Sequence, residues 1–140
     1  MEVCKTLLYL LIFILVQFTI HFLISKLFFG QFKIQLVHLY FDFKIYPYLI
    51  SSILIAPVIE ELFFRKFIIN LLQLKNSDRF SILFSALLFS LIHFPILQSI
   101  ISSLLAGLFL GFIYIRFKKI IYCIFFHFIW NAVLISFQFT

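Results

Sequence analysis

The sequence predicts an all-α protein, a polytopic transmembrane helical bundle with about five spans. Of its 140 residues, 65% are hydrophobic and only 11% are charged, whereas soluble domains are about 45–50% apolar and about 25% charged. The apolar residues also gather in runs long enough to cross a hydrocarbon core of about 30 Å. At about 20 residues per span plus turns, the chain has room for five spans and no separate soluble domain.

The first half of the chain contains two apolar runs. Residues 6–29 form the first span. The polar stretch 30–46 shows no strict hydrophobic period, and we expect a loop or an interfacial helix there. The second run, 47–74, is longer than one straight span needs. Since proline removes a backbone N–H and clashes with the preceding turn, Pro57 predicts a break or kink at residues 53–57, with a new helix beginning close to Pro57.

The second half begins with a polar turn at residues 75–79, where Asn, Ser and Asp supply helix caps. Three further spans follow, at residues 80–94, 98–115 and 120–137. Gly107 and Gly111 lie four residues apart in the middle one of these. Such a pair of small residues lets another helix approach closely.

The basic residues stand mostly at the ends of apolar runs, and the formal net charge is +6. We interpret them as headgroup and topology anchors, so nucleic acid is not expected as a partner. The loops after the second and fourth runs lie on one side if the intervening spans cross, and the positive-inside rule makes that side cytoplasmic. Their basic residues are Lys75, Arg79, Arg116, Lys118 and Lys119.

The N-terminus then lies inside and the 30–46 stretch outside. The many Phe, Ile and Lys residues are typical of an AT-rich bacterial genome. The expected location is therefore the bacterial cytoplasmic membrane, crossed several times.

Three ionisable residues, Glu60, Glu61 and Arg65, interrupt the second apolar run. Each unpaired charge near a bilayer centre costs about 2.5–3.5 kcal/mol, so the three must be paired, hydrated or used in chemistry. Glu61 and Arg65 are four residues apart and can form an ion pair on one helix face. Glu60 lies about 100° around the helix from Glu61 and can face elsewhere.

His93, His127 and Asn131 are further polar residues within apolar runs. Counted from the cytoplasmic ends at about 1.5 Å per residue, Glu60 and His93 lie roughly 21 Å deep, and His127 and Asn131 roughly 12 and 18 Å. Three helices can therefore direct these four side chains into one cavity. A Glu can take a proton from water, a His can orient the water or relay protons, and an Asn can donate to an oxyanion.

The same side chains also suit a metal ion. Glu60, His93 and His127 could hold Zn²⁺ and leave one position open for water. The ordinary HExxH arrangement is absent from the sequence. The residues thus leave zinc-dependent and metal-independent hydrolysis open.

Three motifs in this order resemble the signature of the CPBP family, which includes the type II CAAX prenyl endopeptidases and the bacteriocin-processing and immunity (Abi) proteins. The resemblance covers residues 50–137 as a protease-like core, with residues 1–49 as an N-terminal span and polar loop. The motifs are Glu60-Glu61-x-x-x-Arg65, Phe89-x-x-x-His93 and His127-x-x-x-Asn131.

The resemblance implies an intramembrane endopeptidase that cleaves a membrane-associated or hydrophobic peptide or membrane protein. By similarity, Glu60 activates the hydrolytic water with His93 as its partner, and His127 and Asn131 stabilise the oxyanion. Two supporting residues order the site, Glu61 and Arg65. The biological role expected by analogy is bacteriocin self-immunity or peptide maturation.

Two classes of non-enzyme stay open as alternatives. One is a proton- or ion-coupled transport subunit in which the glutamates and histidines form a relay. The other is an immunity protein that sequesters a toxin in the bilayer without proteolysis. Family members often have more helices before the first motif, so a homo-oligomer, in which a second copy completes the substrate gate, is a further expectation.

Overall fold

The computed structural model of the chain describes residues 2–29, 34–36, 45–94 and 97–139. Most of the 30–46 stretch, for which a loop or interfacial helix was predicted, lies outside these residues. The elements in chain order are α1 (Glu2–Phe29), β1 (Ile34–Leu36), α2 (Ile45–Ile50), η1 (Ser51–Ile55), α3 (Ala56–Glu61), η2 (Leu62–Ile69), α4 (Asn70–Gln73), α5 (Asp78–Leu91), α6 (Leu97–Phe117), α7 (Ile120–Ser136) and β2 (Phe137–Phe139), where η marks π-helix.

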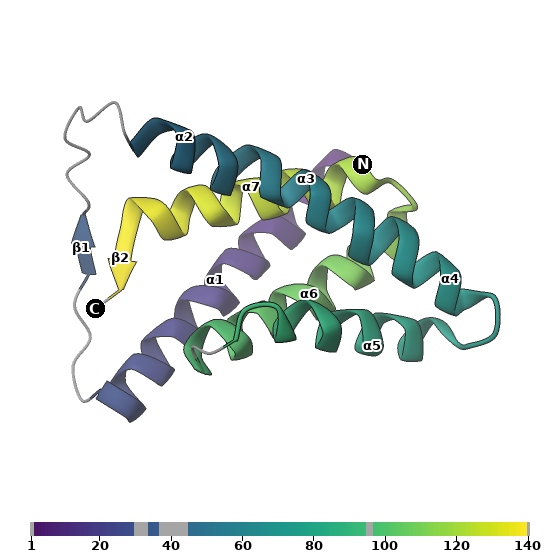
Figure 1. The fold of residues 1–140 in the computed structure, drawn as a ribbon, viewed down its shortest axis with the longest axis horizontal. Coiled ribbons are helices and arrows are strands. Elements are labelled where there is room, and N and C mark those ends of the chain that lie inside the picture. The colour runs from purple at the N-terminus through teal and green to yellow at the C-terminus, as the bar shows by residue number, and fades with distance from the viewer. Residues whose placement is uncertain (1, 30–33, 37–44, 95–96, 140) are drawn as a thin grey trace.

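The all-α prediction is confirmed: the described chain is a bundle of helices whose ends alternate (Figure 1). The N-terminal end of α1 lies toward one end of the bundle, together with the α4–α5 and α6–α7 turns. The end of α1, the start of α2 and the C-terminus lie at the other end. The two loops rich in Lys and Arg therefore share one end, as the charge pattern indicates.

A short antiparallel ladder between β1 and β2 was not predicted from the sequence. Its register pairs Ile34 with Phe139, Gln35 with Gln138 and Leu36 with Phe137. Both segments alternate apolar, polar and apolar residues, which suits a strand. The last helix therefore ends at Ser136, where we expected the span to reach residue 137.

The predicted break at Pro57 is replaced by a change of helix type. The backbone stays helical from α2 through α4, and Ile55 before α3 has φ −76° and ψ −49°. The preceding segment, η1, is π-helical, and the N–H of Ala56 donates to the carbonyl of Ser51, five residues back. This wider turn accommodates the proline ring, and α3 begins at Ala56, close to Pro57 as predicted, without an interruption of the helical backbone.

The turn before α5 is capped as predicted. The backbone N–H of Phe80 donates to Ser77 Oγ at 3.4 Å, and the Ser77 backbone is extended. The helix then runs only to Leu91, short of the predicted residue 94. The next helix, α6, contains residues Ser99–Phe117, which are long and apolar enough to cross a bilayer, whereas the apolar stretches Leu7–Ile20 and Ile120–Leu134 are shorter. The number of spans therefore stays a prediction.

The distribution of polarity is the reverse of that in a soluble protein. Large apolar side chains are exposed on the outer faces, for example Leu7 and Leu15 on α1 and Phe67 on η2. Contiguous exposed apolar surface of this kind marks contact with lipid or protein. Several polar side chains, in contrast, are buried between helices. On α1, buried Gln17 bonds reciprocally with Ser102 of α6: Gln17 Nε2 donates to the Ser102 carbonyl (3.2 Å), and Ser102 Oγ donates to Gln17 Oε1 (2.9 Å).

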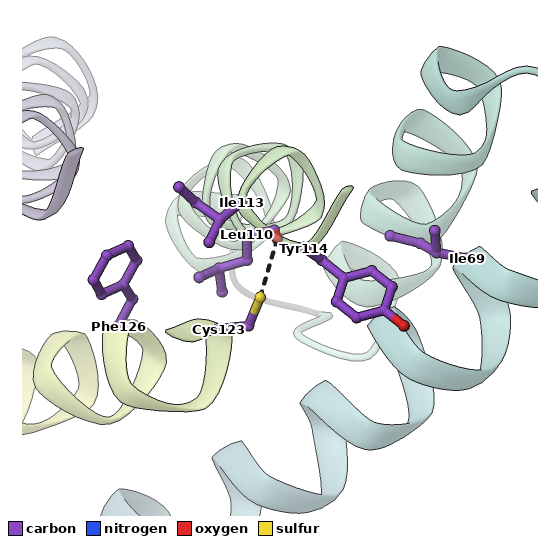
Figure 2. Packing of buried hydrophobic residues seen from close by; sticks show 6 residues of the cluster. All are labelled: Ile69, Leu110, Ile113, Tyr114, Cys123 and Phe126. Atoms are coloured by element: carbon purple, nitrogen blue, oxygen red, sulfur yellow. Dashed lines mark hydrogen bonds between the residues drawn. The ribbon is translucent and has the colours of Figure 1, made fainter. Parts of the chain in front are cut away.

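An apolar core joins η2, α6 and α7 (Figure 2). Its polar atoms are satisfied within it: Cys123 Sγ donates to the carbonyl of Leu110 (3.4 Å), and the Tyr114 hydroxyl donates to Asn70 Oδ1 (3.1 Å). This cluster fixes α7 against α6 just before the part of α7 that carries His127. The six residues are Ile69, Leu110, Ile113, Tyr114, Cys123 and Phe126.

The close helix contact predicted from the two glycines is confirmed. A Cβ at position 107 would lie 3.0 Å from Cα and from Cβ of Ala86 on α5. A Cβ at position 111 would lie 3.0 Å from Ile82 Cγ2, which belongs to a side chain and not to the backbone. A side chain added at position 107 is therefore harder to accommodate than one added at position 111.

We expect Gly107→Ala to lower the free energy of unfolding and Gly111→Ala to leave it nearly unchanged. Both gain about 1 kcal/mol of helix propensity, but overpacking against a backbone atom costs about 1–3 kcal/mol. The thermal midpoint of the purified protein in micelles, followed by the fluorescence of its single tryptophan, Trp130, provides the measurement. A Gly107→Ala variant more stable than Gly111→Ala would contradict the packing described.

Candidate active site

The side chains that the sequence singles out come from three parts of the bundle. Glu60 and Glu61 lie at the end of α3, and Arg65 lies in η2, which continues it. His127 and Asn131 lie one turn apart on α7. The remaining residue, His93, lies in the turn that follows α5, where its backbone N–H donates to the Ser90 carbonyl (3.1 Å).

The His127 ring lies between the two glutamates. Its Nδ1 is 2.9 Å from Glu61 Oε1, and its Nε2 is 3.6 Å from Glu60 Oε2. Because an ionised carboxylate only accepts, the short bond is donated by Nδ1–H, and it fixes the tautomer of the ring. Glu60 therefore does not point away from Glu61, as its position on the helix allowed. The imidazole ring of His127 has a nitrogen on each of two edges, so both consecutive glutamates contact the same ring.

Arg65 forms the predicted ion pair in a fully enclosed position. Its Nε lies 3.1 Å from Glu61 Oε2, with the side chains 1% and 0% exposed. The two atoms are not aligned for a hydrogen bond, and no hydrogen-bond partner for the guanidinium nitrogens is present among the described residues. The guanidinium carbon instead lies 4.5 Å from the centre of the Phe89 ring, a cation–π distance.

Phe89 is the common neighbour of the charged groups. Its ring, which is buried, meets the His127 ring edge to face at 5.6 Å between centroids and the His93 ring at 4.9 Å. It therefore separates Arg65 from the two histidines and limits how far each can turn. The sequence analysis used Phe89 only as part of a motif, although its place four residues before His93 puts it on the same helix face.

His93 is oriented through its own helix. Its Nδ1 lies 2.9 Å from the Phe89 carbonyl. A carbonyl can only accept, so Nδ1 carries the proton and Nε2 is the atom left to exchange protons. Glu60 lies within electrostatic range of both His93 and His127. The acid and the two imidazoles therefore form one electrostatic group.

Asn131 joins the site to the helix before α3. Its Nδ2 donates to the backbone carbonyl of Ser52 in η1 (2.9 Å). An amide nitrogen has two protons, so one donor fixes the side chain and the other is left for a second acceptor. Ser52 was not predicted, because a backbone carbonyl leaves no side-chain signal in a sequence.

A cavity of about 100 Å³ lies beside these groups. Its polar lining comes from His93, His127 and Asn131 together with hydroxyls of α6. The sequence analysis singled out only the two glycines of this helix and did not predict that its serines line the cavity. The α6 residues that line it are Ser99, Ser102, Ser103 and Ala106.

The predicted zinc ligands do not form a metal-binding group in this arrangement. No group of three His, Cys, Asp or Glu side chains in the described part of the chain is arranged to hold a metal ion. In each histidine Nδ1 is held by an acceptor, Glu61 for His127 and the Phe89 carbonyl for His93, so Nε2 is the nitrogen that each could offer to a metal ion. Zinc binding therefore stays a prediction, and no step below passes through a metal.

Comparison with protein families gives one match. Residues 42–133, well over half of the chain, match the family model described as type II CAAX prenyl endopeptidase, Rce1-like. The chain belongs to this family. No curated protein and no solved structure matches it.

Membership of the Rce1-like family confirms the predicted family resemblance and assigns the chain to a group of membrane proteases. All the residues that carry the resemblance lie inside the matched range. The match begins at residue 42, so α1 with Gln17 is outside it. The predicted division at residues 49 and 50 stays a prediction.

We expect Arg65→Met to destabilise the protein by about 3–5 kcal/mol, because it leaves the buried Glu61 carboxylate without its cation. The double variant Glu61→Gln/Arg65→Met removes both charges and recovers part of this loss. Thermal unfolding in micelles of the single and double variants measures the coupling. The control is Arg79→Met, which changes an exposed arginine and has an expected effect within about 0.5 kcal/mol. Equal losses in Arg65→Met and Arg79→Met would contradict a buried ion pair.

Proposed function

We propose that this protein is an intramembrane endopeptidase that hydrolyses a peptide bond in a membrane-associated or hydrophobic peptide. One observation carries the proposal: Glu60 lies beside His127, and His127 lines a cavity together with His93 and Asn131, inside a protein whose outer faces are largely apolar. Membership of a protease family points to the same reaction class. A toxin-binding role does not need this donor set, and a proton relay, which would use the same glutamates and histidines, is not what the family match points to.

In the proposed reaction Glu60 is the general base. It is 23% exposed at its side chain, whereas Glu61 is fully buried, so water reaches Glu60 first. Glu60 takes a proton from the water as its oxygen bonds to the peptide carbonyl carbon. His93, with Nε2 available, orients that water. The C–N bond then breaks, and the proton passes from Glu60 to the leaving amine.

The proposed oxyanion donors are His127 and Asn131. Both line the cavity, and each has one N–H already held by another element, His127 Nδ1–H by Glu61 and Asn131 Nδ2–H by Ser52. His127 can also donate from Nε2 only when its ring carries both protons, so its proposed role requires the imidazolium form between the two glutamates. Donors held in this way need little reorganisation when negative charge develops on the carbonyl oxygen, and one such donor is worth about 10²–10³ in rate. Glu61 and Arg65 are positioning residues that act through His127.

We propose a glutamate-type mechanism that needs no metal ion. The support is the arrangement of donors: Glu60, His93 and His127 do not form a metal-binding group. A carboxylate can act as a general base without a Lewis acid, and Glu60 Oε2 has His127 Nε2 at 3.6 Å.

We further propose a multi-pass location in the bacterial cytoplasmic membrane, with the α4–α5 and α6–α7 turns on the cytoplasmic side. The alternating helix ends, the exposed apolar faces and the basic residues shared by one end support it. Bacteriocin immunity, peptide maturation and a homo-oligomeric state remain predictions from the family resemblance.

We expect Glu60→Gln to lower kcat at least about 100-fold, since general base catalysis contributes about 10²–10⁴. The assay uses a fluorescence-quenched peptide ending in a farnesylated CAAX sequence, and the same peptide with an unmodified cysteine, both in micelles. The control is Asp78→Asn, which makes the same chemical change at an exposed acid of α5. A Glu60→Gln variant that elutes as the wild type and cleaves at wild-type rate would remove the endopeptidase proposal.

We expect cleavage to continue after prolonged dialysis against 1,10-phenanthroline, because no step is assigned to a metal ion. Rates before and after dialysis, with the zinc content of the purified protein, provide the measurement. Loss of cleavage that added Zn²⁺ restores would show that the reaction uses the metal ligands predicted from the sequence, and would replace the glutamate-type mechanism.

A further inference from the structure

A second cavity, of about 380 Å³, lies where α1 begins and α6 meets α7, and it shares no lining residue with the cavity of the candidate active site. Figure 1 shows the N-terminal end of α1 next to the α6–α7 turn. Three basic side chains line this cavity: Lys5 from α1, Arg116 from the last turn of α6, and Lys119 from the residue before α7. Arg116 and Lys119 belong to one sequence run at the α6–α7 turn, and the fold brings Lys5 of α1 beside them.

No carboxylate balances these charges among the acidic side chains that the structure describes. Glu60 and Glu61 are engaged with His127 and Arg65, and Asp78 accepts a hydrogen bond from Gln73. Three like charges around one cavity repel one another unless an anion enters. The cavity is thus suited to a negatively charged group.

The conformation of the α6–α7 turn determines which of its basic side chains line the cavity. Lys118 has a positive φ of 53°, and its N–H donates to the Tyr114 carbonyl (2.7 Å), so the chain reverses within two residues. Lys118 Nζ is directed away from the cavity and donates to Gln73 Oε1 on α4 (3.4 Å). The residues on either side of it in the turn, Arg116 and Lys119, line the cavity.

Three aromatic side chains that contact one another line the cavity. Phe117 meets Tyr9 edge to face at 6.1 Å between centroids and Tyr122 at 5.4 Å, and all three pack against the apolar core. The two tyrosines also bring hydroxyl donors to the lining. This end of the bundle therefore has a shaped cavity, with aromatic residues of the kind found at membrane interfaces.

We propose that this cavity binds the phosphate group of an anionic membrane lipid. Arginine and lysine are the side chains that bind phosphate oxygens, and basic cavities between membrane helices on the cytoplasmic side bind such headgroups. The cavity lies at the end of α6, which contains the stretch long enough to cross a bilayer. Leu8 belongs to its lining, and the exposed faces of Leu11 and Leu15 continue along α1, where acyl chains can lie.

The test measures the thermal midpoint of the full chain in an uncharged detergent during titration with dioleoylphosphatidylglycerol. Parallel titrations use dioleoylphosphatidylcholine, which has a phosphate but no net charge, and inorganic phosphate. We expect phosphatidylglycerol alone to raise the midpoint, and added NaCl to weaken the effect because salt screens the charges. A rise of equal size with phosphatidylcholine or inorganic phosphate would overturn the assignment to an anionic lipid.

The variants Arg116→Gln and Lys119→Gln assign the effect to the cavity. Each should weaken the apparent affinity for phosphatidylglycerol about fivefold, as one basic residue near a membrane surface does. The matched controls Lys75→Gln and Arg79→Gln remove exposed charges from the other loop at the same end and should change it less than twofold. Each variant is compared with its own lipid-free midpoint, and Arg116→Lys, which keeps the charge, should retain most of the affinity. An equal loss in the controls, or no loss in the cavity variants, would overturn the proposal.

Discussion

The buried carboxylate of Glu61 is the group on which the arrangement of the site depends. One of its oxygens accepts a hydrogen bond from His127, and the other lies beside the Arg65 guanidinium. A charge so enclosed is tolerated only with partners in good positions, so the same requirement holds η2, α3 and α7 together. The histidine ring is oriented as a consequence, and it presents its second nitrogen to Glu60. Phe89, with Arg65 above its ring, completes the packing.

Much of the fold follows from composition and from the spacing of apolar runs. The helices α1, α6 and α7 and the capped turn before α5 were predicted close to their observed bounds, because lipid requires continuous helices and Ser and Asp cap them. Two features could not be predicted. The π-helical turn before Pro57 depends on how the helix absorbs a missing N–H, and the ladder between Ile34–Leu36 and Phe137–Phe139 joins segments far apart in the sequence.

The members of the candidate site could also be named from the sequence, because charged and imidazole side chains are rare in apolar runs. Their mutual geometry could not. Counting residues along a helix gives depth but not the direction of a side chain, which here depends on π-helical segments and on packing. The convergence of Glu60 and Glu61 on His127, the attachment of Asn131 to the Ser52 carbonyl, and the serines of α6 at the cavity all required coordinates.

The reciprocal bonds between Gln17 and Ser102 give α1 a larger part in the enzyme than the extent of the family match indicates. Ser102 belongs to the cavity wall, and the amide that holds it comes from a helix outside the matched residues. The residues of the family match are consequently not independent of the helix that precedes them. A version trimmed to residues 42–133 would lose the amide that bonds to Ser102 at the wall of the candidate site.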